Sequence, residues 1–212
     1  GAAGDHEDAD GTVYAELAER IADRISPLVT AVRPRPTRRP ERRDREWDWS
    51  GTPAIIDAAR RGGEPELRRL AEEAQRQFGV ELAVVSIVDG DRLYHGTNVD
   101  VMPASVPLDL SFCRYTVAAG EPVVVPRTAR DERFADNPLV DVSFVNFYAG
   151  YPLRGSDGRV IGSFCLQGSR PRTPSADELG ELERMALEAQ EVLRTYEAAP
   201  TDRPRPIATI RS

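Results

Sequence analysis

Two cysteines are the side chains of this sequence best suited to nucleophilic or redox chemistry. Cys113 could supply a nucleophile and Cys165 a resolving partner, a chemistry that needs a thiolate of low pKa. Cys165, however, lies in an apolar run, where a cysteine is usually a small buried hydrophobe. The sequence therefore favours two buried, unreactive thiols and leaves a thiol-dependent redox enzyme that uses Cys113 as an alternative.

Other catalytic chemistries have little support in the composition. His6 and His95 are the only histidines, and their spacing suits neither a zinc site, a haem site nor a catalytic triad. All 28 basic residues are arginine, so a Schiff-base lysine and a Walker-type lysine are excluded. The net charge of −7 disfavours attraction to nucleic acid or anionic lipid. We predict no catalytic residues, no metal site and a protein that is not an enzyme.

The middle of the sequence contains what a small-molecule pocket requires, namely apolar walls and a few convergent polar groups. Most of these aromatic side chains could instead fill the core, which leaves a structural scaffold with a self-filled pocket as a further alternative. Neither the ligand nor any cofactor can be identified from the residues. The candidate pocket residues are Phe112, Cys113, Tyr115, Thr116, Phe134, Asn137, Phe144, Asn146 and Tyr148, with Phe147 and Tyr151 as further aromatic walls.

Periodicity predicts the elements that must position these residues. Residues 64–78 carry apolar side chains at helical spacing, and residues 80–88 form a run that is apolar on both faces of a strand. Such a strand must be covered on both sides. Asp89 and Gly90 predict a hairpin turn, with a returning strand at 91–97.

The second half of the sequence is predicted in the same way. We expect a short helix at 110–119 capped by Asp109 or Ser111, a strand at 121–125, a loop at 128–137, and a further short helix that begins at Pro138. Strands at 147–153 and 159–166 flank a turn at 157–158. A capping box of Ser175 and Glu178 starts a last helix at 175–197. Two hairpins and a middle strand indicate an antiparallel α+β fold.

The N-terminal quarter and the C-terminal end differ in composition from this domain. We predict a disordered head at 1–11, an amphipathic helix from Thr12 to Val32, an Arg/Pro linker at 33–50, a main domain at 51–198 and a flexible tail at 199–212. The apolar stripe of the first helix is too narrow to fold alone, so we expect a homodimer through residues 12–32 and the terminal helices. The linker contains seven arginines but no interleaved aromatic residues, which makes a nucleic-acid arm the lesser interpretation.

Several motifs, in order, resemble those of GAF domains attached to bacterial signalling proteins. They are SFCRYT at 111–116, EPVVVP at 121–126, DERFADNP at 131–138, FYAGYPL at 147–153 and IGSFC at 161–165. The resemblance covers residues 65–195 and implies a six-stranded antiparallel sheet with the first and last helices on one face and a ligand-sized cavity on the other. Related sequences often carry a histidine where this one has Tyr115, and an aliphatic residue with Asp where it has Leu166 and Gln167.

This resemblance implies a non-catalytic regulatory module in signal transduction, which would bind a small molecule and act through dimer or partner-protein contacts. Some GAF-fold proteins reduce free methionine sulfoxide with thiols, which is the enzymatic alternative for Cys113. The acidic first ten residues lack a signal-peptide core, and no apolar run approaches the roughly 18 residues that span a bilayer. We therefore expect a cytoplasmic protein that does not contact a membrane.

Overall fold

The computed structural model describes residues 64–97, 105–135, 137, 140 and 145–197. They form a six-stranded sheet in the order β3-β2-β1-β6-β5-β4, in which every neighbouring pair is antiparallel. The predicted α+β fold with a six-stranded antiparallel sheet is confirmed. The strands are β1 (Leu82–Asp89), β2 (Arg92–His95), β3 (Ser105–Pro107), β4 (Val123–Val125), β5 (Phe147–Arg154) and β6 (Val160–Gly168).

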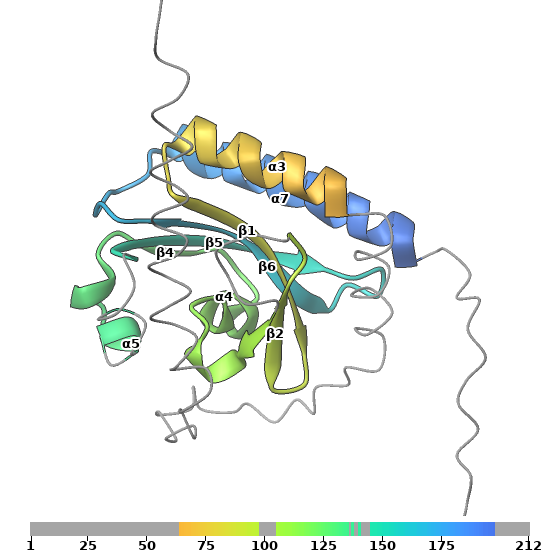
Figure 1. Ribbon diagram of the computed structural model, residues 1–212, viewed down its shortest axis with the longest axis horizontal. Helices are drawn as coiled ribbons and strands as arrows, with labels where there is room; N and C mark the ends of the chain where they lie inside the picture. The colour runs from red at the N-terminus through yellow and green to blue at the C-terminus, as the bar shows by residue number, and fades with distance from the viewer. Residues whose placement is uncertain (1–63, 98–104, 136, 138–139, 141–144, 198–212) are drawn as a thin grey trace, which may run out of the picture.

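Two long helices cover one face of the sheet. Helix α3 (Glu64–Phe78) and helix α7 (Ala176–Glu197) lie side by side across β1, β5 and β6, as the resemblance implied (Figure 1). The apolar stripe of α3, which includes Leu67, Leu70 and Ala74, is buried against Met185 and Ala189 of α7 and against the sheet. Among the described residues, this layer is the larger of two apolar cores.

The opposite face of the sheet carries shorter elements. Helix α4 (Cys113–Ala119) packs on β5 and β6, and helix α5 (Glu132–Ala135) lies farther out beside it (Figure 1). Short 3-10 helices, η2 (Leu108–Leu110) and η3 (Thr128–Arg130), precede α4 and α5. Because both faces are covered, all nine residues of β6 and seven of the eight in β1 are buried.

The start of α7 follows the predicted capping box. The Ser175 hydroxyl accepts a hydrogen bond from the backbone N–H of Glu178 at 3.2 Å, and the Glu178 carboxylate accepts one from the Ser175 N–H at 2.8 Å. Both predicted hairpins are present, with Gly90 and Gly158 at positive φ of 60° and 80°.

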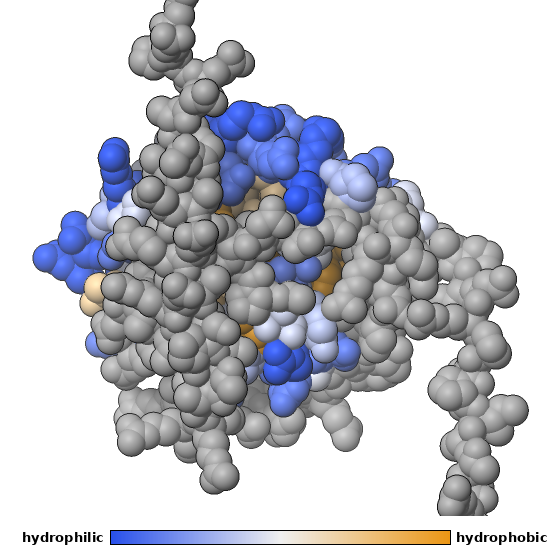
Figure 2. Space-filling model, viewed as in Figure 1, coloured by the Kyte–Doolittle hydropathy of each residue, from blue (hydrophilic) through white to orange (hydrophobic). Residues whose placement is uncertain are grey.

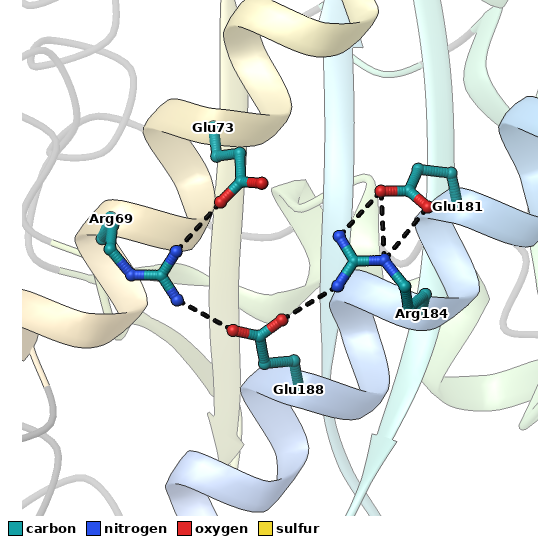
Figure 3. Close-up of polar contacts among 5 residues, drawn as sticks. All are labelled: Arg69, Glu73, Glu181, Arg184 and Glu188. Atoms are coloured by element: carbon teal, nitrogen blue, oxygen red, sulfur yellow. Dashed lines mark hydrogen bonds and ion pairs between the residues drawn. The ribbon is translucent and has the colours of Figure 1, made fainter.

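Charged side chains join the exposed sides of the two long helices. Arg69 of α3 pairs with Glu73 of its own helix at 2.9 Å and with Glu188 of α7 at 2.8 Å, and Glu188 also pairs with Arg184 at 3.0 Å (Figure 3). Hydrophilic residues accordingly dominate the visible outer surface over α3 (Figure 2). Surface pairs of this kind contribute less than about 1 kcal/mol each, so burial and not the ion pairs holds the helices together.

Two predicted elements differ from the structure. Residues 128–137, predicted as a loop, contain η3 and α5, because the Asp131 carboxylate accepts the backbone N–H of Arg133 and starts a helical turn. The helix predicted at 110–119 begins at Cys113, and its N-cap is Phe112, with no side-chain cap. Ser111 still contributes there, since its hydroxyl accepts the Cys113 N–H at 3.1 Å.

Several predictions lie outside the described residues. They are the head at 1–11, the helix at 12–32, the linker at 33–50, the domain boundaries at 51 and 198, the tail at 199–212, the start of a helix at Pro138, and the side chain of Phe144. Within the part of the chain that the structure describes, no helix combines the length and apolarity needed to cross a membrane.

Candidate functional site

Four aromatic residues predicted to line a pocket gather on the α4 face of the sheet. Phe134 of α5 stacks on Phe112 with ring centroids 5.3 Å apart, and it lies 4.7 Å from Tyr115 and 5.7 Å from Tyr148. Phe134 and Tyr148 have no exposed surface. The described side chains of this aromatic cluster therefore fill the space between α4, α5 and β5 largely with one another.

A buried hydrogen bond joins α4 to β5 beneath this cluster. The hydroxyls of Thr116 and Tyr148 lie 2.7 Å apart, and both residues are fully buried. Burial raises the pKa of Tyr148 well above its usual value, so the phenol remains neutral. Gly150 makes room for this pair, because a Cβ at that position would lie 2.3 Å from the Tyr148 oxygen and 2.5 Å from that of Thr116.

The two asparagines predicted to line the pocket lie in different parts of the structure. Asn137 is buried and donates from Nδ2 to the backbone carbonyl of Leu110 at 2.9 Å, which ties the segment after α5 to the segment before α4. Asn146 donates from Nδ2 to the Ser169 carbonyl at 3.0 Å, at the end of β6. Asn146 thus connects two backbone segments where β5 begins and β6 ends, whereas Asn137 lies next to Phe134 of the aromatic cluster.

Two of the aromatic residues predicted to line the pocket lie on the opposite face of the sheet from the aromatic cluster. Phe147 and Tyr151 point toward α3 and α7, where the Tyr151 hydroxyl donates to Glu183 of α7 at 2.7 Å. The cause is the alternation of β5, which sends residues 147, 149 and 151 to one side and Tyr148 to the other. The prediction that Phe147 and Tyr151 line the pocket was therefore wrong.

The structure brings the two cysteines together. Cys113 at the start of α4 and Cys165 in the middle of β6 are buried, with their sulfurs 3.4 Å apart. The Ser86 hydroxyl of β1 lies 3.7 Å from the Cys113 sulfur, and Gln167 donates from Nε2 to the Cys165 sulfur at 3.6 Å. The prediction that both thiols are buried agrees with the structure, but their proximity was not predicted.

The two thiols differ in pKa. Hydrogen bonding with Cys165 lowers the pKa of Cys113 to about 6, with help from the nearby Ser86 hydroxyl and against the effect of burial. The same contact, together with burial, raises the pKa of Cys165 well above its usual value. Cys113 is thus the thiol of the pair that ionises first.

The lowered pKa of Cys113 makes the free energy of unfolding depend on pH. Cys113 ionises near pH 6 in the folded chain but near its ordinary value of 9.0 when unfolded, so its contribution to stability is complete above pH 9. That contribution is lost as the pH falls through about 6. We expect the stability difference between the wild type and Cys113→Ser to widen from pH 6 to pH 8.5, measured by urea unfolding with reductant present. A constant difference over this range would contradict the lowered pKa.

Two arginines flank the outer edge of the aromatic cluster, a feature that sequence reasoning missed. The Arg114 guanidinium lies 4.5 Å from the ring centroid of Tyr115 and donates to its hydroxyl, while Arg133 lies 5.6 Å above the ring of Phe134. Asp131 holds Arg133 in place through an ion pair at 2.7 Å. Both arginines stand next to predicted site residues in the sequence, but only the fold shows that they meet at Tyr115.

Metal binding receives no support from the residues that the structure describes. Among them, no group of three or more histidine, cysteine or acidic side chains is arranged to hold an ion. The thiol pair supplies only two such ligands, whereas a structural zinc site needs four.

Comparison with known proteins gives a consistent result. The family model of the GAF domain matches residues 63–192. A cyclic di-GMP phosphodiesterase from Pseudomonas aeruginosa is 30% identical over 127 residues, which make up 59% of this chain and 22% of that protein. This chain therefore spans about a fifth of the length of that relative.

Solved structures with similar folds have diverse sequences. A type II free methionine-R-sulfoxide reductase from Thermoplasma acidophilum superposes with a TM-score of 0.54 at 10% identity, over 67% of this chain and 96% of that one. A GAF domain from Thermosynechococcus elongatus in its blue-light absorbing form gives a TM-score of 0.53 at 11% identity, over 65% and 88%. At these identities the likeness concerns the fold alone.

Proposed function

This chain belongs to the GAF domain family, and from that premise we propose that it is a non-catalytic regulatory module whose aromatic cluster responds to a small molecule. The observation that carries the proposal is Arg154 at the end of β5. Its side chain donates to the carbonyl of Gly120 at the end of α4 at 2.7 Å, and its backbone N–H donates to Gln190 of α7, also at 2.7 Å. One residue thereby links the candidate site to a terminal helix.

Strand β5 supplies a second connection between the same two layers. Tyr148 packs in the aromatic cluster, while Phe147 and Tyr151 of the same strand pack on the opposite face, against α3 and α7. Both residues are at most three positions from Tyr148 in the sequence. A ligand that displaces Tyr148 or tilts α4 would shift β5 and, through Arg154, the end of α7. Such coupling requires a ligand that binds one arrangement of the helices better than the other.

The proposed output is a contact with another protein. The buried packing between α3 and α7 makes the two helices one unit that can move together, and the ion pairs of Figure 3 lie on its exposed side. The exposed side of α7 also presents Leu187 with 48% of its surface accessible. We propose that these helices, with residues 12–32, form a homodimer or contact a signalling partner, and that Arg114 and Arg133 favour a ligand bearing negative charge.

The test combines native mass spectrometry with hydrogen exchange. The freshly purified chain should carry a small molecule whose mass is lost on denaturation, and its removal should speed amide exchange in α4 and in the second half of α7. Arg154→Ala should retain the added mass but weaken the effect on α7, because the side-chain link to Gly120 is broken while the packing of β5 and the backbone bond to Gln190 remain. Ligand-dependent exchange in α7 that is unchanged in Arg154→Ala would contradict the proposed route.

Two alternatives follow from specific observations. The mutual packing of the aromatic cluster supports a scaffold with a self-filled pocket, which predicts no added mass and no metabolite-dependent change in exchange. The 3.4 Å sulfur separation supports a thiol enzyme acting on free methionine sulfoxide. A substrate of that size would first have to displace the packing around buried Cys113, so the enzyme is the weaker candidate.

A further inference from the structure

The cysteine pair is unusual because it joins two elements that are distant in the sequence. Cys113 and Cys165 are 52 positions apart in the sequence. Cys113 lies in helix α4, which covers one face of the sheet, whereas Cys165 lies in strand β6 of the sheet itself. The sulfurs need to approach by only about 1.3 Å from their separation of 3.4 Å to reach the length of a disulfide bond. A small approach of the two sulfurs would therefore bring them to bonding distance between α4 and β6.

The surroundings of the pair differ from those of an inert apolar thiol. The Ser86 hydroxyl lies 3.7 Å from the Cys113 sulfur within an otherwise apolar core. Together with the contact to Cys165 it stabilises the Cys113 thiolate, which is the reactive form of cysteine, whereas Cys165 stays protonated and can act second. The roles of attacking and resolving thiol are thus assigned by position.

We propose that Cys113 and Cys165 form a buried two-electron redox site, in which a small neutral hydroperoxide oxidises the dithiol to an intramolecular disulfide. The Cys113 thiolate attacks one peroxide oxygen, the O–O bond breaks, and the products are a sulfenic acid and hydroxide (alkoxide, from an alkyl hydroperoxide), which takes up the proton that the Cys113 thiol lost on ionising and leaves as water (or alcohol). The Cys165 thiol then attacks the sulfenic sulfur, the S–O bond breaks, and a second water leaves. The two sulfurs lose two electrons in total, which the peroxide gains.

Burial of both sulfurs limits which oxidants can reach them. Both sulfurs are covered, so a reagent must enter by small fluctuations of the packing around α4. Hydrogen peroxide is close to water in size, whereas an aromatic disulfide reagent is far larger. The proposal does not depend on the small-molecule role of the aromatic cluster, because the reaction needs only the thiol pair and the oxidant.

The experiment measures oxidation of the folded, reduced chain by hydrogen peroxide. After a timed exposure, the chain is unfolded in N-ethylmaleimide and its intact mass is recorded. We expect a loss of about 2 Da with no maleimide added, and recovery of two maleimide-reactive thiols after dithiothreitol. Two maleimide groups on the peroxide-treated chain, or disulfide that forms only as fast as the chain unfolds, would overturn the proposal.

Three variants separate the roles of the residues, with circular dichroism to confirm folding. Cys165→Ser should stop at a sulfenic acid that dimedone traps once the oxidised chain is unfolded in its presence, and Cys113→Ser should react far more slowly at the same peroxide dose, because burial still raises the pKa of Cys165. Ser86→Ala should slow disulfide formation several-fold, since it removes one hydroxyl 3.7 Å from the Cys113 sulfur. Equal oxidation of Cys113→Ser and the wild type would refute the assigned order of attack.

Discussion

Gly162→Ala is expected to destabilise the domain by about 3 kcal/mol or more, the upper range for overpacking a buried position. Gly162 lies in β6 opposite Ile87 of β1, and a Cβ there would lie 1.9 Å from the backbone oxygen of Ser86. No rotamer change can relieve a clash with backbone, so the two central strands would have to separate. Urea unfolding followed by circular dichroism measures the loss.

Gly180→Ala is the matched control, because it makes the same chemical change in a different environment. Gly180 lies within α7 with nothing within 4 Å of a Cβ built on it. Alanine should therefore stabilise the helix by about 0.5–1 kcal/mol. If both alanine variants shift the urea midpoint by similar amounts, the close approach of β1 and β6 does not require glycine at position 162.

Much of the fold follows from local patterns that leave few alternatives. The strand apolar on both faces at 80–88 requires cover on both sides, and β1 has it. The capping box at Ser175 and the turns at Gly90 and Gly158 were predicted because their chemistry is local. By contrast, α5 depends on the Asp131 carboxylate and on burial of Phe134, and the second of these is a tertiary effect.

The candidate site was predictable only in part. The alternation of β5 could have placed Phe147 and Tyr151 opposite Tyr148, since the strand itself was predicted from the sequence. The 3.4 Å contact between Cys113 and Cys165 had no such signal. It depends on how α4 crosses the sheet, and neither periodicity nor spacing determines that crossing.

Phe134→Ala is expected to cost about 3–5 kcal/mol, the usual range for truncating a buried aromatic side chain. Phe134 has no exposed surface and contacts the rings of Phe112, Tyr115 and Tyr148. Arg133→Ala, on the neighbouring residue of the same short helix, should cost less than about 1 kcal/mol because its ion pair is partly exposed. Equal losses in urea unfolding would show that α5 is not held by its aromatic contact.

The same variant also distinguishes a sensor from a scaffold. If the aromatic cluster binds a small molecule, Phe134→Ala should lose the added mass in native spectra, whereas Arg133→Ala, which leaves the cluster and Arg114 in place, should weaken retention without abolishing it. If the cluster only fills the domain, the two variants should differ in stability while neither carries added mass. The stability measurement and the mass measurement are independent, because the first reports contacts within the cluster and the second reports what enters it. A stable Phe134→Ala domain that keeps its ligand would place the binding site away from this cluster.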